Sequence, residues 1–292
     1  MLLRERFLNR SEALAFRELQ KIASDNALQA FAKPRLSDVL LKDRYLTPSE
    51  YSMYSLAHFD FLLTDGSYLP VLAIEYDGPR HAEKVQANRD VIKNSFCSEA
   101  GLPLIRIGAN YVVREYRGMT LLRWIVEVIE LEKAFDQAQQ RGLVPWEEPF
   151  DPLMIMDDGS DRKWPYWLSV RETIRINNFL KGDLENRSWT GLHGKAPNGD
   201  ILWLEYLTTQ EGVLYARCRF RDQLAPFPFW DLMGEVGKFE MGRRLLEYTN
   251  NGEISLLTHD DFARVLDRLK KEYDLQSGHF AGKVRGAAEF TI

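Results

Sequence analysis

Residues 56–81 constrain the fold most, because they place acidic residues inside what otherwise reads as buried β-structure. The sequence LAHFDFLLTDGSYLPVLAIEYDGPRH predicts two strands, over 56–63 and 69–77, joined by a turn. Asp60 interrupts the first strand, and Glu75 and Asp77 interrupt the second. Burying an uncompensated carboxylate on such a strand is strongly unfavourable. A divalent metal ion is the simplest compensation, so the segment favours a metal-dependent hydrolase.

The surrounding sequence predicts a mixed sheet flanked by helices. Apolar residues at helical spacing and short apolar runs locate the remaining elements. The expected helices span residues 11–23, 83–100 and 118–140, and the further strands span 36–41 and 102–108. A polar loop is expected after residue 41 and through Pro48. Because a helix connects the strands 69–77 and 102–108, at least one parallel or mixed strand pairing is expected.

A stretch rich in Pro, Asp and Gly divides the chain. It contains EEPFDP and DDGSDRKWP, and residues of this kind favour loops and linkers. We therefore expect a domain over residues 1–142, a linker over 143–165 and a smaller α+β domain over 166–292. In the second domain, helices are expected near 168–181, 229–249 and 259–273, with a hairpin formed by 201–208 and 212–220.

The charge distribution argues against a strongly basic DNA-binding surface. Residues 1–150 hold 19 Lys and Arg against 21 Asp and Glu, and residues 151–292 hold 19 against 22. A strong non-specific DNA binder usually has a basic domain or stripe. A nuclease is still compatible with these numbers, since its catalytic carboxylates add negative charge and its phosphate contacts can be few.

Cysteine usage and hydropathy favour a cytoplasmic protein. Cys97 and Cys218 are far apart and form no disulfide framework, as expected in a reducing compartment. The N-terminal sequence carries charges every few residues and lacks the apolar core of a signal peptide. No apolar run approaches the roughly 20 residues that cross a membrane. Association with a membrane is therefore not expected.

Four motifs in a fixed order carry a resemblance to a known superfamily. They are a glutamate on an N-terminal helix, HFDFLL, IEYDGPRH and RDVIKNSFCSEAGLPLIRI. This order resembles the PD-(D/E)xK restriction-endonuclease-like superfamily and, more narrowly, bacterial domains of uncharacterised function near the very-short-patch-repair endonucleases. The resemblance covers roughly residues 10–130 and implies a restriction-endonuclease-like core. Residues 150–292 resemble no family that we recognise.

The resemblance also implies roles for individual residues. Asp60 and Glu75 match the two acids that hold one or two Mg²⁺ ions in this superfamily, with Mn²⁺ as a substitute. The backbone carbonyl of Tyr76 would complete this set, and Glu12 matches an acid that some members add to it. The bound metal would position a water molecule, lower its pKa and stabilise the phosphate as the P–O bond breaks.

One position departs from the superfamily motif, and several roles stay open. Asp77 stands where the motif has a lysine, and it could instead form the Asp-Gly turn. Lys93 could supply the missing ammonium from the next helix, or it could pair with Asp90. His81 could shuttle a proton or protonate the leaving group. Glu12 could simply complement the dipole of its helix. The general base is therefore not assigned.

The sequence thus predicts a Mg²⁺-dependent endonuclease that hydrolyses phosphodiester bonds, with DNA as the expected substrate. Asp60 and Glu75 would bind the metal, and Asp77, His81 and Lys93 would complete the site. Residues 151–292 would recognise the substrate or contact a partner protein. The alternative is a catalytically inactive nuclease-fold module that binds nucleic acid or a partner protein, which the missing motif lysine and the lack of a basic face favour.

Overall fold

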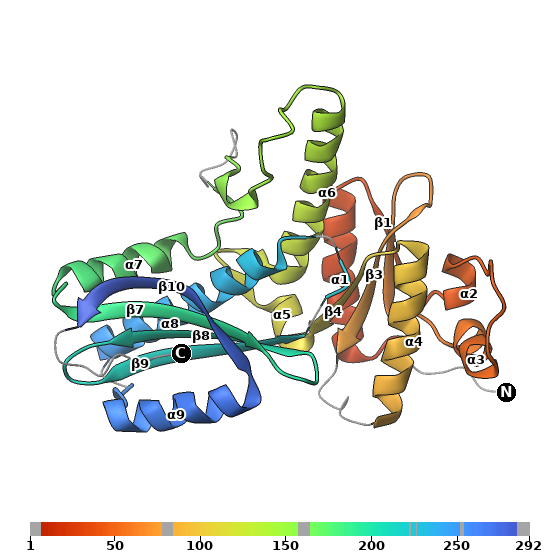
Figure 1. The fold of residues 1–292 in the computed structure, drawn as a ribbon. Coiled ribbons are helices and arrows are strands. Elements are labelled where there is room, and N and C mark those ends of the chain that lie inside the picture. Colours follow the sequence, from red (N-terminus) through yellow and green to blue (C-terminus); the bar gives the residue numbers. More distant parts are fainter. Residues whose placement is uncertain are drawn as a thin grey trace. The chain divides into compact units, whose positions relative to one another are not determined.

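The protein has a mixed α+β fold and forms two compact units (Figure 1). The structure is a computed structural model, and it describes residues 7–77, 84–156, 164–221, 223–225, 227–251 and 254–284. The first unit comprises Met1–Phe150 and Gln223–Phe227, and the second comprises Asp151–Asp222 and Pro228–Ile292. The division after Phe150 lies within the predicted linker, whereas no sequence signal indicated that residues 223–227 belong to the first unit.

A four-stranded mixed sheet forms the centre of the first unit, in the order β1-β2-β3-β4. Its strands are β1 (Gln29–Ala32), β2 (Phe61–Thr64), β3 (Pro70–Asp77) and β4 (Leu104–Gly108). β2 pairs with its neighbours in antiparallel fashion, and β3 pairs with β4 in parallel. This confirms the predicted mixed sheet and locates the parallel pairing at the helical crossover.

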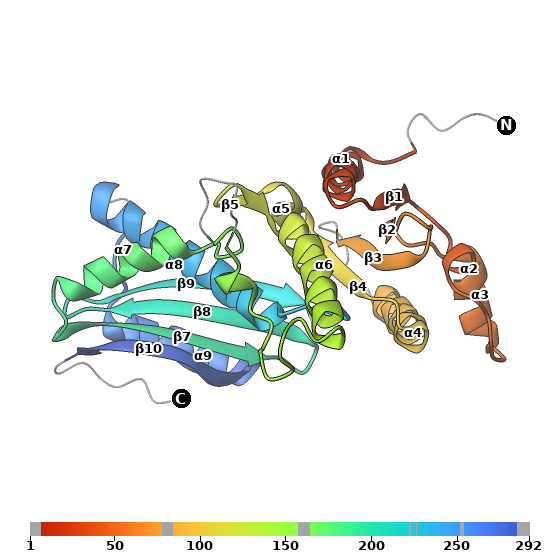
Figure 2. The same cartoon turned by 90° about the horizontal axis from the view of Figure 1, so that it is seen from above.

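Helices cover both faces of this sheet (Figures 1 and 2). They are α1 (Arg10–Asp25), α2 (Leu36–Val39), α3 (Pro48–Leu56), α4 (Lys84–Ala100), α5 (Ala109–Val113) and α6 (Leu121–Gln140). A two-stranded hairpin of β5 (Glu115–Tyr116) and β6 (Met119–Thr120) precedes α6. α4 lies on one face and α1 on the other, where Phe16 of α1 stacks on Phe61 of β2 with ring centroids 5.6 Å apart.

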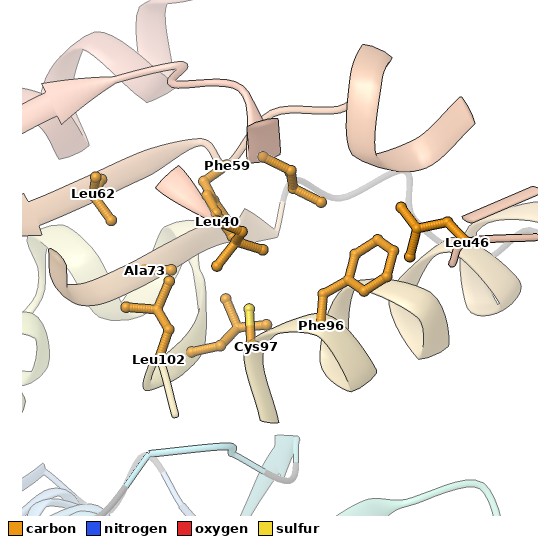
Figure 3. Close-up of a cluster of buried hydrophobic side chains, with 10 residues drawn as sticks. Leu40, Leu46, Phe59, Leu62, Ala73, Phe96, Cys97 and Leu102 are labelled. Atoms are coloured by element: carbon orange, nitrogen blue, oxygen red, sulfur yellow. The ribbon is translucent and has the colours of Figure 1, made fainter. Parts of the chain in front are cut away.

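A buried apolar cluster attaches α4 to the sheet (Figure 3). Phe96 and Cys97 of α4 pack with Leu62 of β2 and Ala73 of β3. Burial of these side chains is the main source of the packing energy, at about 25 cal/mol per Å² of apolar surface. Because residues three and four apart share one side of a helix, the cluster also turns Lys93 toward the sheet.

The structure contradicts the strand predicted over residues 36–41. Residues 36–39 form α2 instead, and the first strand of the sheet is β1. Leu36, Val39 and Leu40 follow a helical spacing of three and four rather than the alternation of a strand. Leu36 and Leu40 are accordingly buried together, while the next residue, Leu41, is exposed.

The first acidic strand is also shorter than predicted. Residues 48–56 form α3, although Pro48 was expected at the end of a loop, Leu56 at the start of the strand, and no element was predicted between them. Thr47 caps this helix by accepting a hydrogen bond from the backbone N–H of Glu50, and Pro48 occupies its first turn, where a missing N–H costs nothing. The strand therefore begins only at Phe61, so Asp60 lies immediately before β2 and not within it.

The second unit is an antiparallel sheet in the order β10-β7-β8-β9, with helices on both faces. Its elements are η1 (Pro152–Met154), α7 (Val170–Lys181), β7 (Asn186–Lys195), β8 (Asp200–Thr208), β9 (Val213–Arg221), α8 (Phe229–Asn251), α9 (His259–Glu272) and β10 (Asp274–Val284). α7 and α8 pack on one face and α9 on the other. The predicted hairpin and three helices are confirmed, whereas β7 and β10 were not predicted. Within the described ranges, no helix is long and apolar enough to cross a membrane.

Candidate functional site

A row of charged residues crosses the sheet of the first unit. One residue comes from each of the four adjacent chain segments: Lys33, Asp60, Glu75 and Arg106. The backbone N–H of Lys33 donates to the carbonyl of Asp60 at 2.9 Å, and Glu75 is the register partner of Arg106. The residue after Asp60 pairs with Ile74, so Asp60 and Glu75 are the next positions on adjoining segments. The fold therefore brings the two predicted metal ligands next to each other.

Hydrogen bonds from two donors hold the carboxylate of Asp60. Its Oδ1 accepts from Nζ of Lys33 at 2.5 Å, and its Oδ2 accepts from the backbone N–H of Tyr76 at 2.9 Å. A carboxylate that accepts from a backbone N–H and an ammonium is fixed in orientation, because charge-assisted bonds are the stronger ones. The position of Asp60 just before β2 allows its side chain to reach across to the backbone of β3.

Glu12 belongs both to the end of its helix and to this charged row. Its Oε2 accepts from the backbone N–H of Asn9, the N-cap residue, in a capping box. Its Oε1 accepts from Nζ of Lys33 at 2.9 Å. The predicted role as a helix-end acid is thus present, and the same side chain also reaches the site through Lys33.

Lys33 is the site residue that the sequence did not reveal. Its ammonium contacts Glu12 and Asp60, which lie 21 and 27 residues away, and no motif spacing connects these positions. Burial acts to lower the pKa of Lys33, but the hydrogen bonds that its ammonium donates to Asp60 and Glu12, together with their negative charges, outweigh burial and raise this pKa. The ammonium therefore keeps its charge within the site.

The Lys93 ammonium supports Glu75 from α4. Nζ of Lys93 lies 2.7 Å from Oε1 of Glu75 and also donates to the carbonyl of His58 at 3.1 Å. The side chains of Lys93 and Glu75 are only 9% and 12% exposed. Burial raises the pKa of Glu75, the charge of Lys93 opposes this, and the negative charge of Asp60 adds to the rise. The structure therefore places the Lys93 ammonium at the second predicted acid, the position from which it could supply the charge of the missing motif lysine.

Arg106 provides a second buried cation beside Glu75. Its guanidinium donates to Asn94 at 2.7 Å and lies 3.9 Å from Asp90, both on α4. Its backbone is held from the other side of β4, where the amide of Gln223 accepts from the Arg106 N–H at 2.7 Å and donates to its carbonyl at 3.3 Å. Arg106 is thus an ordered part of the site.

Two of the predicted site residues lie wholly or partly outside the described residues. Asp77 ends β3, but its side chain is not among those described, and His81 falls in the segment 78–83. Their predicted roles therefore remain predictions. Glu12, Asp60, Glu75, Tyr76 and Lys93 are all described. Lys33 connects Glu12 with Asp60, the backbone N–H of Tyr76 donates to Asp60, and Lys93 contacts Glu75. The adjoining register positions of Asp60 and Glu75 bring these two sets of contacts into one charged network.

The donors in this network are chemically suited to Mg²⁺. Among the side chains that the structure describes, no group of three or more His, Cys, Asp or Glu residues could hold a metal ion. Mg²⁺, however, is commonly bound through one or two carboxylates, with water and substrate phosphates completing its shell. Asp60 and Glu75 are near enough that the charge of Asp60 contributes to the raised pKa of Glu75. These two carboxylates are of the chemical type that Mg²⁺ prefers, and they occupy adjoining positions in the sheet register.

The segment that contains Glu12, Lys33, Asp60, Glu75, Lys93 and Arg106 is similar to known proteins. Residues 4–120 match a family described as a protein of unknown function, DUF2726. An uncharacterised protein of Haemophilus influenzae is 29% identical over 133 residues, which are 42% of this chain and 66% of that protein. The uncharacterised protein y4bI of Sinorhizobium fredii is 32% identical over 97 residues, 32% of this chain and 68% of that protein. The chain thus spans about two thirds of the length of these relatives. No solved structure matches the chain significantly.

Proposed function

The chain belongs to the DUF2726 family of proteins of unknown function, and we propose that it is a Mg²⁺-dependent nuclease that hydrolyses phosphodiester bonds in DNA. The first unit would be a restriction-endonuclease-like core. The observation that carries the proposal is the contact between Lys93 and Glu75. It supplies a buried ammonium beside the second acid, although Asp77 occupies the motif position of the lysine.

Each residue of the candidate site has its own role in this proposal. Asp60, Glu75 and the carbonyl of Tyr76 would hold the metal, which supplies an activated water and positive charge for the phosphate. The backbone N–H of Tyr76 orients Asp60. Lys93 orients Glu75 and favours its ionised form, which is the form that binds a cation. Arg106 adds a positive charge beside the same carboxylate.

One observation favours the inactive-module alternative. Asp60 and Glu75 each already contact a lysine ammonium, so their charges are compensated within the protein. A buried network of this kind can be purely structural, because perturbed carboxylates also occur in ion-pair networks without catalytic function. In that case, the unit would bind nucleic acid or a partner protein without cleaving it.

Cleavage assays with matched variants test the proposal. The full chain with Mg²⁺ or Mn²⁺ should nick or cut at least one of single-stranded, duplex or branched DNA. Asp60→Asn and Glu75→Gln should each reduce the rate by about 100-fold or more, as expected when a group that stabilises the transition state is lost. Asp25→Asn, which changes a half-exposed acid paired with Arg123, should leave the rate unchanged.

Two results would contradict the proposal. Cleavage that survives in both Asp60→Asn and Glu75→Gln would show that the activity comes from another site or from a contaminant. DNA binding without cleavage, in the presence of either metal, would instead support the inactive module.

A further inference from the structure

Lys33 places a positive charge between two carboxylates of the candidate site. Its Nζ lies 2.9 Å from Oε1 of Glu12 and also contacts Oδ1 of Asp60. All three side chains are less than a fifth exposed, at 16% for Lys33, 17% for Glu12 and 18% for Asp60. Water therefore screens these charges far less than it would at an open surface.

The backbone of Lys33 helps to impose this position. Lys33 has a φ of +57°, in the left-handed region that a residue with a side chain adopts only when its surroundings require it. Two backbone hydrogen bonds stabilise this turn out of β1: the Lys33 N–H donates to the carbonyl of Asp60, and the Phe59 N–H donates to that of Pro34. The ammonium is thus directed at the carboxylates by the fold.

Two cations cannot share Asp60 without a cost. A divalent ion on this carboxylate would lie next to the Lys33 ammonium, and like charges a few ångströms apart repel strongly in partly buried surroundings. Glu12 offers the ammonium a second partner that stays in place, since its other oxygen is fixed by the capping box at the start of α1. The ammonium can therefore release Asp60 and keep a carboxylate.

We propose that Lys33 is an exchangeable counter-cation, which neutralises Asp60 in the metal-free protein and transfers to Glu12 alone when a divalent ion binds Asp60. This inference rests on the proposed function, because it requires a metal at Asp60. It makes Lys33 a positioning residue that sets the affinity for metal, and it makes Glu12 the acceptor of the displaced ammonium and not a ligand.

A calorimetric titration of the full chain with Mn²⁺ as the only added ligand measures the metal affinity, which this exchange should control. Lys33→Met removes the competing charge, so Mn²⁺ should bind more tightly by about 5- to 150-fold, the usual range of coupling between two bound groups. Lys33→Gln keeps a polar end near Asp60 and should also tighten binding, which provides a second variant if the first folds poorly. Lys21→Met changes an exposed lysine on the same helix as Glu12 and should have no effect.

A double-mutant cycle tests the role of Glu12. Glu12→Gln alone should weaken Mn²⁺ binding, because the ammonium then has only Asp60 as a partner. In the Lys33→Met background, Glu12→Gln should have no further effect. A metal ligand at Glu12 would instead weaken binding equally in both backgrounds, and that result would overturn the proposed transfer.

The same titrations separate this inference from the proposed function. Binding that Asp60→Asn abolishes, but that neither Lys33 variant tightens, would overturn the exchange and leave the metal site intact. Absence of Mn²⁺ binding in the wild type and in every variant would overturn the metal site and the exchange together.

Discussion

Nζ of Lys93 lies 2.7 Å from Oε1 of Glu75, in a position where both side chains are almost fully buried. The two residues are 18 positions apart and come from α4 and β3. Such a pair contributes little net stability compared with apolar residues of similar size, but removing one partner leaves a buried charge. We therefore infer that the main role of this pair is to hold the charged carboxylate of Glu75 in one position.

Removal of Lys93 alone should destabilise the protein strongly. Lys93→Met is expected to lower the free energy of unfolding by about 3–5 kcal/mol, because Glu75 remains buried without its ammonium. The double variant Lys93→Met, Glu75→Gln should recover much of this loss. Urea unfolding measures both values. Lys133→Met, which breaks a partly exposed pair with Glu130, provides the control and should change stability by less than about 1 kcal/mol. Equal losses in Lys93→Met and Lys133→Met would contradict the prediction.

Gln223 should stabilise the edge strand β4 through its hydrogen bonds to the backbone of Arg106. Gln223→Leu removes both hydrogen bonds to the backbone of Arg106 and leaves that N–H and carbonyl without their amide partner. A loss of about 1–3 kcal/mol is expected, together with faster hydrogen exchange at the Arg106 amide. Gln210→Leu, at an exposed position, is the control. Unchanged exchange at Arg106 would show that water replaces the side chain without cost.

A buried acid in the second unit should make stability depend on pH. Glu235 of α8 is fully buried, and burial raises its pKa despite the charge of Lys238 and a hydrogen bond from the Ser169 N–H. Between the ordinary pKa and the raised one, the folded protein binds more protons than the unfolded chain. Its stability therefore falls as the pH rises through that window.

Glu235→Gln should remove this dependence. Because glutamine cannot ionise, the variant should be more stable than the wild type above the window and gain nothing below it. Thermal unfolding between pH values of about 4 and 8 measures the difference, and each 1.4 kcal/mol of gain corresponds to about one unit of raised pKa. Glu247→Gln, at a partly exposed site paired with Arg243, should show no such trend. A gain that is constant with pH would contradict the assignment.

A close contact between α8 and the second sheet predicts the effect of an added methyl group. A Cβ at Gly237 would lie 2.2 Å from Cδ1 of Trp203, whose indole is held by a hydrogen bond to Glu205 at 2.7 Å. Gly237→Ala should therefore destabilise the protein by about 1–3 kcal/mol, although alanine favours helices. Gly66→Ala has open space around it and is the control. Stabilisation by Gly237→Ala would mean that Trp203 can move.

Local patterns predicted most of the secondary structure. The acidic hairpin, the helix α4 and the strand β4 follow from apolar periodicity and turn residues, which act over a few positions. The strand predicted over 36–41 was wrong because a short apolar run, here Val39 to Leu41, occurs in strands and in short helices alike. The helical spacing of Leu36, Val39 and Leu40 becomes decisive only through their packing against α4 and the sheet. β1, with only four residues, gives too weak a signal to be found.

The candidate site was predictable only in part. Asp60 and Glu75 stand out because acids are unusual beside apolar strands, and the structure places them at adjoining positions. Lys33 could not be found, since a lysine at a strand end is unremarkable until the register brings it to Asp60. The contact of Gln223 with Arg106 spans 117 residues, a separation that no local pattern encodes.

The chain returns to the first unit at residues 223–227, and this has a consequence for its synthesis on the ribosome. β4 leaves the ribosome long before residues 223–227, which belong to the same unit. At about 5–20 residues per second, the intervening 117 positions take roughly 6–23 seconds. Throughout that interval the outer edge of β4 lacks its final neighbour, so the nascent first unit presents an incomplete sheet edge to chaperones or to other chains.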